Sequence, residues 1–284
     1  MNISDKSDIY GLAGHPLGHS FSPAYFNRMF AEKDIAARYE LFDIPSAEDF
    51  LPLVQSTERL KGLNVTIPYK ESVISYLDAM TDRARMAGAV NCVAVRRDAD
   101  GKLRLTGDNT DIEGCRESLR PLLLDCGWIA TPDGTLHDKE GNAPRYPALI
   151  LGTGGGAKGV AVAMAELGFK ALLISRSESK GDLTYSDLDP ESVWRAPVII
   201  NATPAGMAPV TLAAPPFPFQ YLRGAAGTAP RQAAFDLIYN PDPTLFMRIC
   251  AAHGLATMSG LRMLHLQADA SWRFWNEETM PSLP

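Results

Sequence analysis

Residues 152–157 read Gly-Thr-Gly-Gly-Gly-Ala, a composition typical of a turn that binds phosphate groups. A short apolar run, Leu149 to Leu151, precedes them, and Val160 and Met164 follow at helical spacing. In such a strand–turn–helix unit, glycines permit the tight turn and the close approach of the backbone to a pyrophosphate, and the helix N-terminus offers free N–H groups. A second apolar run, Ala171 to Ile174, follows at the distance of a βαβ unit. The pattern predicts a dinucleotide site built from Gly152, Thr153, Gly154, Gly155, Gly156 and Ala157.

The residues after the second apolar run indicate which dinucleotide binds. An NAD-binding chain usually carries Asp or Glu about twenty residues after the glycine turn, where the carboxylate bonds the ribose 2′-hydroxyl. This chain has Ser175, Arg176 and Ser177 there, with Lys180 close behind. A guanidinium and small hydroxyls suit a 2′-phosphate better than a 2′-hydroxyl. The sequence therefore predicts NADP, and a solvated surface arginine is the alternative interpretation.

Lys70 and Asp111 are the candidates for proton transfer. Lys70 stands just beyond a strand pattern, residues 63–67, that ends at Pro68. A lysine needs a neighbouring carboxylate or desolvation to do proton chemistry, and Asp111 is the partner candidate. The alternative for Lys70 is a solvated helix lysine, and the alternative for Asp111 is an N-cap of the helix expected over residues 112–119. Sequence spacing alone leaves these alternatives open.

Ser20 and Ser22 are candidates for binding an anion. Pro23 is expected in the first turn of a helix that continues through Phe26 and Met29, with Ser22 at its N-cap. Two hydroxyls one residue apart at a helix start can face a carboxylate together with the helix end. A plain helix cap is the alternative for Ser22.

Short apolar runs that alternate with helical patterns predict an α/β fold that positions these residues. Strands are expected at residues 9–13, 39–43, 63–67, 87–95, 103–106, 149–151, 171–174, 198–200 and 235–239. Helices are expected through residues 22–30, 46–59, 112–119 and 245–253, after the glycine turn, and from Gly260 onward. Gly- and Pro-rich composition predicts a linker and surface excursion at residues 120–147 and a loop at 209–231.

Composition excludes several classes of protein. The 284 residues suffice for two domains, and the net charge of −6 argues against nucleic acid as a general partner. No apolar run approaches the length of a membrane span, and the N-terminus does not resemble a signal peptide. The 4 cysteines and 5 histidines are scattered. They indicate reduced thiols in a cytoplasm and no metal site.

Eight motifs, in order along nearly the whole chain, resemble those of the shikimate dehydrogenase family. They lie at residues 14–23, 62–70, 88–91, 109–111, 152–155, 201–207, 236–239 and 260–268. The resemblance implies two α/β domains with a cleft between them. Residues 1–112, completed by a C-terminal helix at 262–284, would form a substrate-binding and catalytic domain with a mostly parallel sheet. Residues 113–261 would form a Rossmann-type NADP-binding domain.

The resemblance also implies residue roles. Lys70 would be the acid/base, with Asp111 beside it and touching a substrate hydroxyl. The substrate carboxylate would be bound by Ser20 and Ser22. The ring hydroxyls would be bonded, or their pocket lined, by Thr66, Asn91, Tyr239 and Gln267. The adenosine phosphate would be held by Ser175, Arg176, Ser177 and Lys180. The nicotinamide would be surrounded by Thr203, Met207, Leu237 and Gly260.

The implied activity is the reversible, NADPH-dependent reduction of 3-dehydroshikimate to shikimate in chorismate and aromatic amino-acid biosynthesis. The implied enzyme is a cytoplasmic monomer or homodimer without a metal. A paralogue acting on quinate and a non-catalytic NADP-binding sensor are the alternatives, although a sensor is expected to lose Lys70 or Asp111. The chain departs from the family pattern at Phe26, Cys92, Ser175, Arg262 and Asp269, and its 120–147 excursion is longer than typical.

Overall fold

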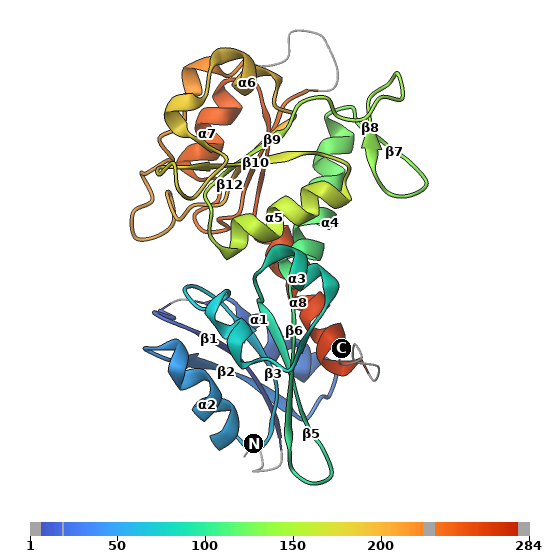
Figure 1. The fold of residues 1–284 in the computed structure, drawn as a ribbon, viewed down its shortest axis with the longest axis vertical. Coiled ribbons are helices and arrows are strands. Elements are labelled where there is room, and N and C mark those ends of the chain that lie inside the picture. The colour runs from blue at the N-terminus through green and yellow to red at the C-terminus, as the bar shows by residue number, and fades with distance from the viewer. Residues whose placement is uncertain (1–6, 19, 224–230, 278–284) are drawn as a thin grey trace. The chain divides into compact units, whose positions relative to one another are not determined.

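The computed structural model describes residues 7–18, 20–223 and 231–277, which leaves His19, part of the 209–231 loop and residues 278–284 outside the described residues. Contacts divide the chain into two compact units. Unit 1 comprises Met1–Thr110 and Ala268–Pro284, and unit 2 comprises Asp111–Gln267. The C-terminal part of the chain, red in Figure 1, thus returns to the unit that contains the N-terminus.

Unit 1 is built on one mixed sheet of six strands in the order β2-β1-β3-β5-β6-β4. The strands are β1 (Asp8–Gly14), β2 (Ala37–Asp43), β3 (Leu60–Val65), β4 (Ala79–Met80), β5 (Cys92–Arg97) and β6 (Leu103–Asp108). The helices are α1 (Ser22–Glu32), α2 (Phe50–Ser56) and α3 (Asp82–Ala87), with 3-10 turns at Ala47–Asp49 and Ser72–Tyr76. Parallel pairs join β1 to β2 and β3, and β4 to β6, whereas β5 runs antiparallel to β3 and β6.

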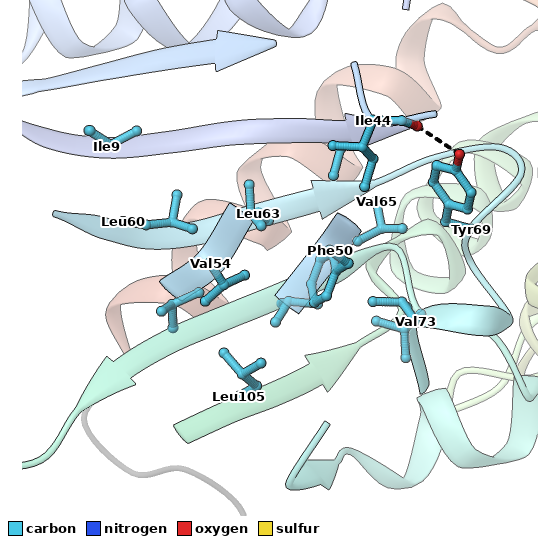
Figure 2. Close-up of a cluster of buried hydrophobic side chains, with 14 of the residues drawn as sticks. Ile9, Ile44, Phe50, Val54, Leu60, Leu63, Val65, Tyr69, Val73 and Leu105 are labelled. Carbon is cyan, nitrogen blue, oxygen red and sulfur yellow. Dashed lines mark hydrogen bonds between the residues drawn. The ribbon is translucent and has the colours of Figure 1, made fainter. Parts of the chain in front are cut away.

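Alternation of side chains gives this sheet two apolar faces. Figure 2 shows one of them, where Leu63 and Val65 of β3 pack with Phe50 and Val54 of α2. Residues of the opposite face, including Tyr10 of β1, pack against α1 and the end of α8 (Leu261–Asn276). The sheet therefore holds α1 and the C-terminal helix on one side and α2 on the other.

Unit 2 is built on a six-stranded sheet in the order β11-β10-β9-β12-β13-β14, in which every pair is parallel. The strands are β9 (Ala148–Leu151), β10 (Ala171–Ser175), β11 (Leu183–Thr184), β12 (Val198–Asn201), β13 (Ala233–Asp236) and β14 (Ala256–Ser259). The helices are α4 (Thr110–Asp125), α5 (Gly155–Glu166), α6 (Pro190–Arg195), α7 (Leu245–Ala252) and the start of α8. Helices α5 and α7 make the crossovers that parallel neighbours require. This is the predicted Rossmann-type arrangement.

The prediction that residues 120–147 are irregular is wrong for part of this range. Helix α4 continues to Asp125, and β7 (Ile129–Ala130) pairs with β8 (Leu136–His137) in a small hairpin. Pro121 lies inside α4 and cannot donate to the Glu117 carbonyl, which accepts instead from Arg262 Nε at 3.5 Å. A contact from α8 thus offsets the missing helical hydrogen bond.

Several other element boundaries differ from the predictions. The strand expected at 87–95 begins only at Cys92, because residues 82–87 form α3, which ends at Gly88 with φ +57°. The strand expected at 63–67 ends at Val65. The strand expected at 235–239 ends at Asp236, whose carboxylate accepts from the Ile238 N–H at 3.0 Å and turns the chain. Strand β14 and helix α6 were absent from the prediction, and the helix expected to reach residue 284 ends at Asn276.

No helix among the described residues has the length and apolar character needed to cross a membrane. Within the same residues, no three His, Cys, Asp or Glu side chains gather as metal ligands do.

Candidate active site

The predicted cofactor residues of unit 2 meet at one edge of its sheet. Residues at or next to the carboxyl ends of adjacent strands stand side by side in register, namely Ile174, Leu151, Asn201, Asp236 and Ser259. The next residue along the chain is the last residue of β10 in the first case and the first residue of a loop in the other four. Those residues are Ser175, Gly152, Ala202, Leu237 and Gly260. Ligands of parallel α/β sheets bind at this edge.

The glycine turn has room for a pyrophosphate. Gly152 has φ +117°, and a Cβ there would lie 3.0 Å from the Ala202 carbonyl oxygen. Helix α5 begins at Gly155 with Gly154 as N-cap, and no side chain bonds its first N–H groups. Open space surrounds the position of a Cβ at Gly154. A helix N-terminus without a side-chain cap, next to a glycine with open space at its Cβ position, fits the phosphates of a dinucleotide.

The residues predicted to hold an adenosine phosphate follow β10. Ser175 is buried and its hydroxyl accepts from the Ser177 N–H at 3.0 Å, whereas Arg176 and Lys180 are exposed. Burial raises the pKa of Tyr185, and the nearby positive charge of Arg176 opposes that rise. Tyr185, which the sequence did not single out, is therefore an aromatic neighbour of the exposed guanidinium.

The loop after β12 is held by two buried side chains, Asn201 and Asp236. Asn201 Oδ1 accepts from the Thr203 N–H at 3.0 Å and from the Thr203 hydroxyl at 2.7 Å. Asn201 Nδ2 donates to Asp236 Oδ1 at 3.1 Å, and the Thr244 hydroxyl donates to Asp236 Oδ2 at 2.6 Å. Burial raises the pKa of Asp236 to about 6, although these hydrogen bonds oppose the rise. Hydrogen bonds of Asn201 thus connect Asp236 with Thr203, which is a predicted nicotinamide contact.

Of the remaining predicted nicotinamide contacts, Gly260 lies directly against Leu237. A Cβ at Gly156 would lie 3.6 Å from Leu237 Cδ2, and a Cβ at Gly260 would lie 2.1 Å from the Leu237 carbonyl oxygen. Met207, on the loop after β12, is 47% exposed. These positions and the glycine turn are brought together at the carboxyl edge.

In unit 1, three of the predicted substrate residues lie on adjoining backbone segments. The Thr66 N–H donates to the Ala13 carbonyl at 2.9 Å, the Val65 N–H to the Asn91 carbonyl at 2.8 Å, and the Val90 N–H to the Lys70 carbonyl at 2.7 Å. Tyr69, which precedes Lys70, donates its hydroxyl to the Ile44 carbonyl at 2.7 Å within the apolar cluster of Figure 2. The core of unit 1 therefore fixes the segment that carries Lys70.

Asn91 is 3% exposed and uses its side-chain oxygen inside the protein. Its Oδ1 accepts from the Thr110 N–H at 2.7 Å and from the Thr110 hydroxyl at 3.1 Å, so Asn91 caps the start of α4. Among the described residues, no hydrogen bond involves its Nδ2. This group is a donor available to a ligand.

The two serines occupy the start of α1, but the predicted N-cap is wrong by one residue. The N-cap is Phe21, and Ser22 is the first residue of the helix. The Ser22 N–H donates to Ser20 Oγ at 3.2 Å, so Ser20 supplies the hydroxyl that satisfies a helix N–H. A side-chain hydrogen bond joins Ser22 to the buried Tyr39.

Asp111 and Gln267 lie in unit 2, on two helices that touch. Helix α4 begins before Asp111, so Asp111 is in its first turn rather than at its N-cap. A Cβ at Gly114, one turn further on, would lie 3.0 Å from Gln267 Cβ of α8. Gln267 donates from Nε2 to the Leu264 carbonyl at 2.9 Å. Tyr239, the last predicted substrate residue, is half-buried after β13.

Comparison with known proteins identifies the family. Residues 12–93 match the model of the shikimate dehydrogenase substrate binding domain. A protein of Symbiobacterium thermophilum named shikimate dehydrogenase (NADP(+)) is 33% identical, and the alignment covers 94% of this chain and 88% of that protein. The chain belongs to the shikimate dehydrogenase family.

Two solved structures place this family member among enzymes of one fold. Shikimate 5-dehydrogenase of Thermus thermophilus, in complex with NADP(H) and shikimate, has a TM-score of 0.75 and 28% identity, with 97% of this chain and 95% of that chain covered. A 5-ketofructose reductase of a Gluconobacter species has a TM-score of 0.71 and 25% identity, with 98% and 95% covered. One of these proteins is named a shikimate 5-dehydrogenase and the other a 5-ketofructose reductase. The fold alone therefore does not determine the substrate.

Most departures from the family pattern have partners in the structure. Phe26 is fully buried and stacks on Tyr39, with ring centroids 4.5 Å apart. Asp269 accepts from the Tyr25 hydroxyl at 2.6 Å. Cys92 is fully buried in the apolar face that contains α1. These residues are therefore part of the packing of unit 1.

Proposed function

We propose that this protein is an NADP-dependent shikimate dehydrogenase that reversibly reduces 3-dehydroshikimate to shikimate. The observation that carries the proposal is similarity to such an enzyme over 94% of the chain, in a sequence that has both Lys70 and Asp111. In this proposal, residues 1–112 with the helix from 262 form the substrate domain, and residues 113–261 form the NADP domain.

NADP would be held at the carboxyl edge of the unit 2 sheet. The N-terminus of α5 and the turn at residues 152–157 would hold the pyrophosphate, because the helix has no side-chain cap and open space surrounds the Cβ position of Gly154. Arg176, with Ser175, Ser177 and Lys180, would bind the 2′-phosphate. Thr203, Met207, Leu237 and Gly260 would border the nicotinamide. NADPH, when bound, supplies the hydride.

The chain's own residues would bind the acid and move the proton. Ser20 and Ser22 would accept the substrate carboxylate at the start of α1, and Asn91 Nδ2 would donate to a ring hydroxyl. Further ring contacts would come from Thr66, Tyr239 and Gln267. Lys70 would donate a proton to the carbonyl oxygen as it becomes a hydroxyl, and Asp111 would hold the ammonium group in place. No proposed step requires a metal.

The same proposal covers the biological setting. The protein would act in the cytoplasm, as a monomer or homodimer, on a small-molecule acid of chorismate and aromatic amino-acid biosynthesis. A paralogue that also oxidises quinate is the second candidate, and the structural likeness to a reductase of another name is the reason to test it. A non-catalytic sensor is disfavoured because Lys70 and Asp111 are present.

The test is oxidation of shikimate and of quinate by the purified protein, each with NADP and with NAD, followed by absorbance of the reduced nicotinamide. We expect turnover of shikimate with NADP and little with the other three combinations. Comparable activity on quinate would support the paralogue. Absence of activity in all four assays, with NADP binding intact, would contradict the enzymatic proposal.

A further inference from the structure

Four buried polar residues of unit 1 form a ring of hydrogen bonds that three side-chain contacts and one backbone carbonyl complete. They are Asn64 of β3, Asn91 before β5, Thr110 at the start of α4 and Ser271 of α8, with exposed fractions of 5%, 3%, 0% and 0%. Ser271 Oγ is hydrogen-bonded to Asn64 and to Thr110. Asn64 Nδ2 also donates to the backbone carbonyl of Asn91, and the Thr110 hydroxyl donates to Asn91 Oδ1. Ser271 has no role in the family motifs, yet it closes the ring around a proposed substrate residue.

The chemistry of the groups sets the direction of the hydrogen bonds. An amide oxygen only accepts, so the Thr110 hydroxyl donates its single proton to Asn91 Oδ1 at 3.1 Å. Ser271 Oγ lies 3.0 Å from Thr110 Oγ1, so a hydrogen bond joins the two hydroxyls. Ser271 accepts in turn from Asn64 Nδ2 at 2.9 Å, and the Tyr39 hydroxyl donates to Asn64 Oδ1 at 2.8 Å. A continuous chain of hydrogen bonds therefore runs from Tyr39 through Asn64, Ser271 and Thr110 to Asn91.

The hydrogen bonds from Thr110 decide which end of the Asn91 amide is available to a ligand. Asn91 Oδ1 is occupied by two donors from Thr110, its hydroxyl and its N–H. Nδ2 is left as the donor on the other side of the amide group. A reversed amide would bring its NH2 group to two donors and would lose both bonds, at a buried site where unmade bonds are costly.

We infer that Ser271 is a positioning residue of the substrate site, which acts through Thr110 on the orientation of the Asn91 amide. The inference rests on the proposed function, in which Asn91 Nδ2 donates to a ring hydroxyl. The same bond holds Thr110, the first residue of α4 and the neighbour of Asp111 in the chain. Helix α8 thus contributes to substrate binding through Ser271 as well, a residue that does not itself touch the substrate.

The chain offers a matched control for Ser271. Ser118 of α4 is also a fully buried helical serine, and its hydroxyl donates to the Gly114 carbonyl of its own helix at 2.7 Å. Removal of either hydroxyl deletes one buried oxygen, but only Ser271→Ala breaks the chain that leads to Asn91.

The experiment is steady-state kinetics of the full-length protein with shikimate and NADP. We expect Ser271→Ala to lower kcat/KM for shikimate about tenfold, the effect of one net hydrogen bond, through a raised KM for shikimate. The KM for NADP and the kinetics of Ser118→Ala are expected to stay at wild-type values. Thr110→Val breaks the same chain and should cause a similar loss, whereas Thr110→Ser keeps the hydroxyl and should retain activity. The double variant S271A/T110V should lose no more than the worse single variant.

Equal losses in Ser271→Ala and Ser118→Ala, or losses that multiply in the double variant, would overturn the inference. Thr110→Val and Thr110→Ser test the same chain if Ser271→Ala does not fold, and equal activity of these two variants would also overturn it. A wild-type protein inactive on shikimate would overturn the proposed function and this inference together. An active wild type with a fully active Ser271→Ala variant would overturn the inference alone.

Discussion

Lys70 is the residue on which the proposed chemistry depends most directly. Its backbone is bonded to Val90 within unit 1, and the predicted cofactor residues belong to unit 2. We expect Lys70→Ala to lower kcat for shikimate oxidation at least about a hundredfold, the lower range of general acid–base catalysis, and to leave NADP affinity unchanged. Initial rates and calorimetric titration with NADP measure the two effects.

The exposed lysine of β3, Lys61, provides the control, because Lys61→Ala removes the same charge and should retain activity. Parallel losses of activity and of NADP affinity in Lys70→Ala would instead mean that Lys70 supports the fold.

The prediction that the protein binds NADP rather than NAD depends on Arg176. If its guanidinium binds the 2′-phosphate, Arg176→Asp removes a charge-assisted hydrogen bond that only NADP makes. We expect the Kd for NADP to rise roughly ten- to a hundredfold, as for bonds to charged groups of about 1.5–3 kcal/mol, and the Kd for NAD to change little. Arg248→Asp makes the same charge change at an exposed position of α7 and should affect neither nucleotide. Equal weakening of NADP and NAD by Arg176→Asp would remove the phosphate role.

At the scale of residues, the sequence indicates the residues that would bind ligands or move protons. It does not indicate the residues that position them by hydrogen bonds. The glycine turn was predicted because its neighbours lie within one segment. Ser271 was not, because its partner Asn64 lies 207 positions earlier in the chain. Asn64 and Asp236 were visible only as members of the motifs at residues 62–70 and 236–239, with no role assigned to either. Their hydrogen bonds depend on tertiary contacts that no local pattern contains.

At the scale of elements, we expect Gly260 to be required for the stability of the fold and Gly154 to be required for binding NADP. A Cβ at Gly260 would lie 2.1 Å from the Leu237 carbonyl oxygen and 2.6 Å from its carbon, both backbone atoms that cannot rotate away. We expect Gly260→Ala to lower the free energy of unfolding by about 3 kcal/mol, the upper range for overpacking.

Gly154 has φ −77° and open space at its Cβ position. Gly154→Ala should therefore leave stability unchanged and weaken NADP binding, since its methyl group would enter the space proposed for the pyrophosphate. Urea unfolding and NADP titration of both variants measure the contrast. Equal stability losses, or a Gly260→Ala variant as stable as wild type, would contradict it.

The elements that were mispredicted are those whose local signal conflicts with a tertiary contact. Helix α3 has only six residues, too few for a helical period, and is set by its Thr81 cap and Gly88 end. Residues 237–239 are apolar like a strand, but the Asp236 carboxylate bonds the Ile238 N–H and turns the chain. Pro121 suggests a break, yet Arg262 contacts the carbonyl that the proline leaves unbonded. Long runs with clear periodicity, such as α1 and the buried strands of unit 2, were predicted correctly.

At the scale of the whole molecule, the buried carboxyl of Asp236 links stability to pH. Asp236 is fully buried, and burial raises its pKa from 3.8 to about 6. The negative charge of Asp242 adds to the rise, whereas bonds from Thr244, Ile238 and Asn201 oppose it. The folded state therefore holds this proton more tightly than the unfolded state. Its contribution to stability is present below pH 3.8 and is lost as the pH rises through about 6.

Asp236→Asn removes this titration, so the comparison with wild type isolates it. The wild-type free energy of unfolding, minus that of the variant, should decrease by about 2.4 kcal/mol between pH 4 and pH 7, because one pKa unit corresponds to about 1.36 kcal/mol and part of the 3.8-to-6 shift is already lost at pH 4. A constant offset from altered hydrogen bonds does not change this slope. Urea unfolding at several pH values within that range measures it. Asp187, whose pKa is lowered by hydrogen bonds from Thr184, gives a control of opposite sign, since its stabilising contribution is lost as the pH falls. A difference between wild type and Asp236→Asn that is flat or rises with pH would show that Asp236 is already ionised in the folded protein at low pH.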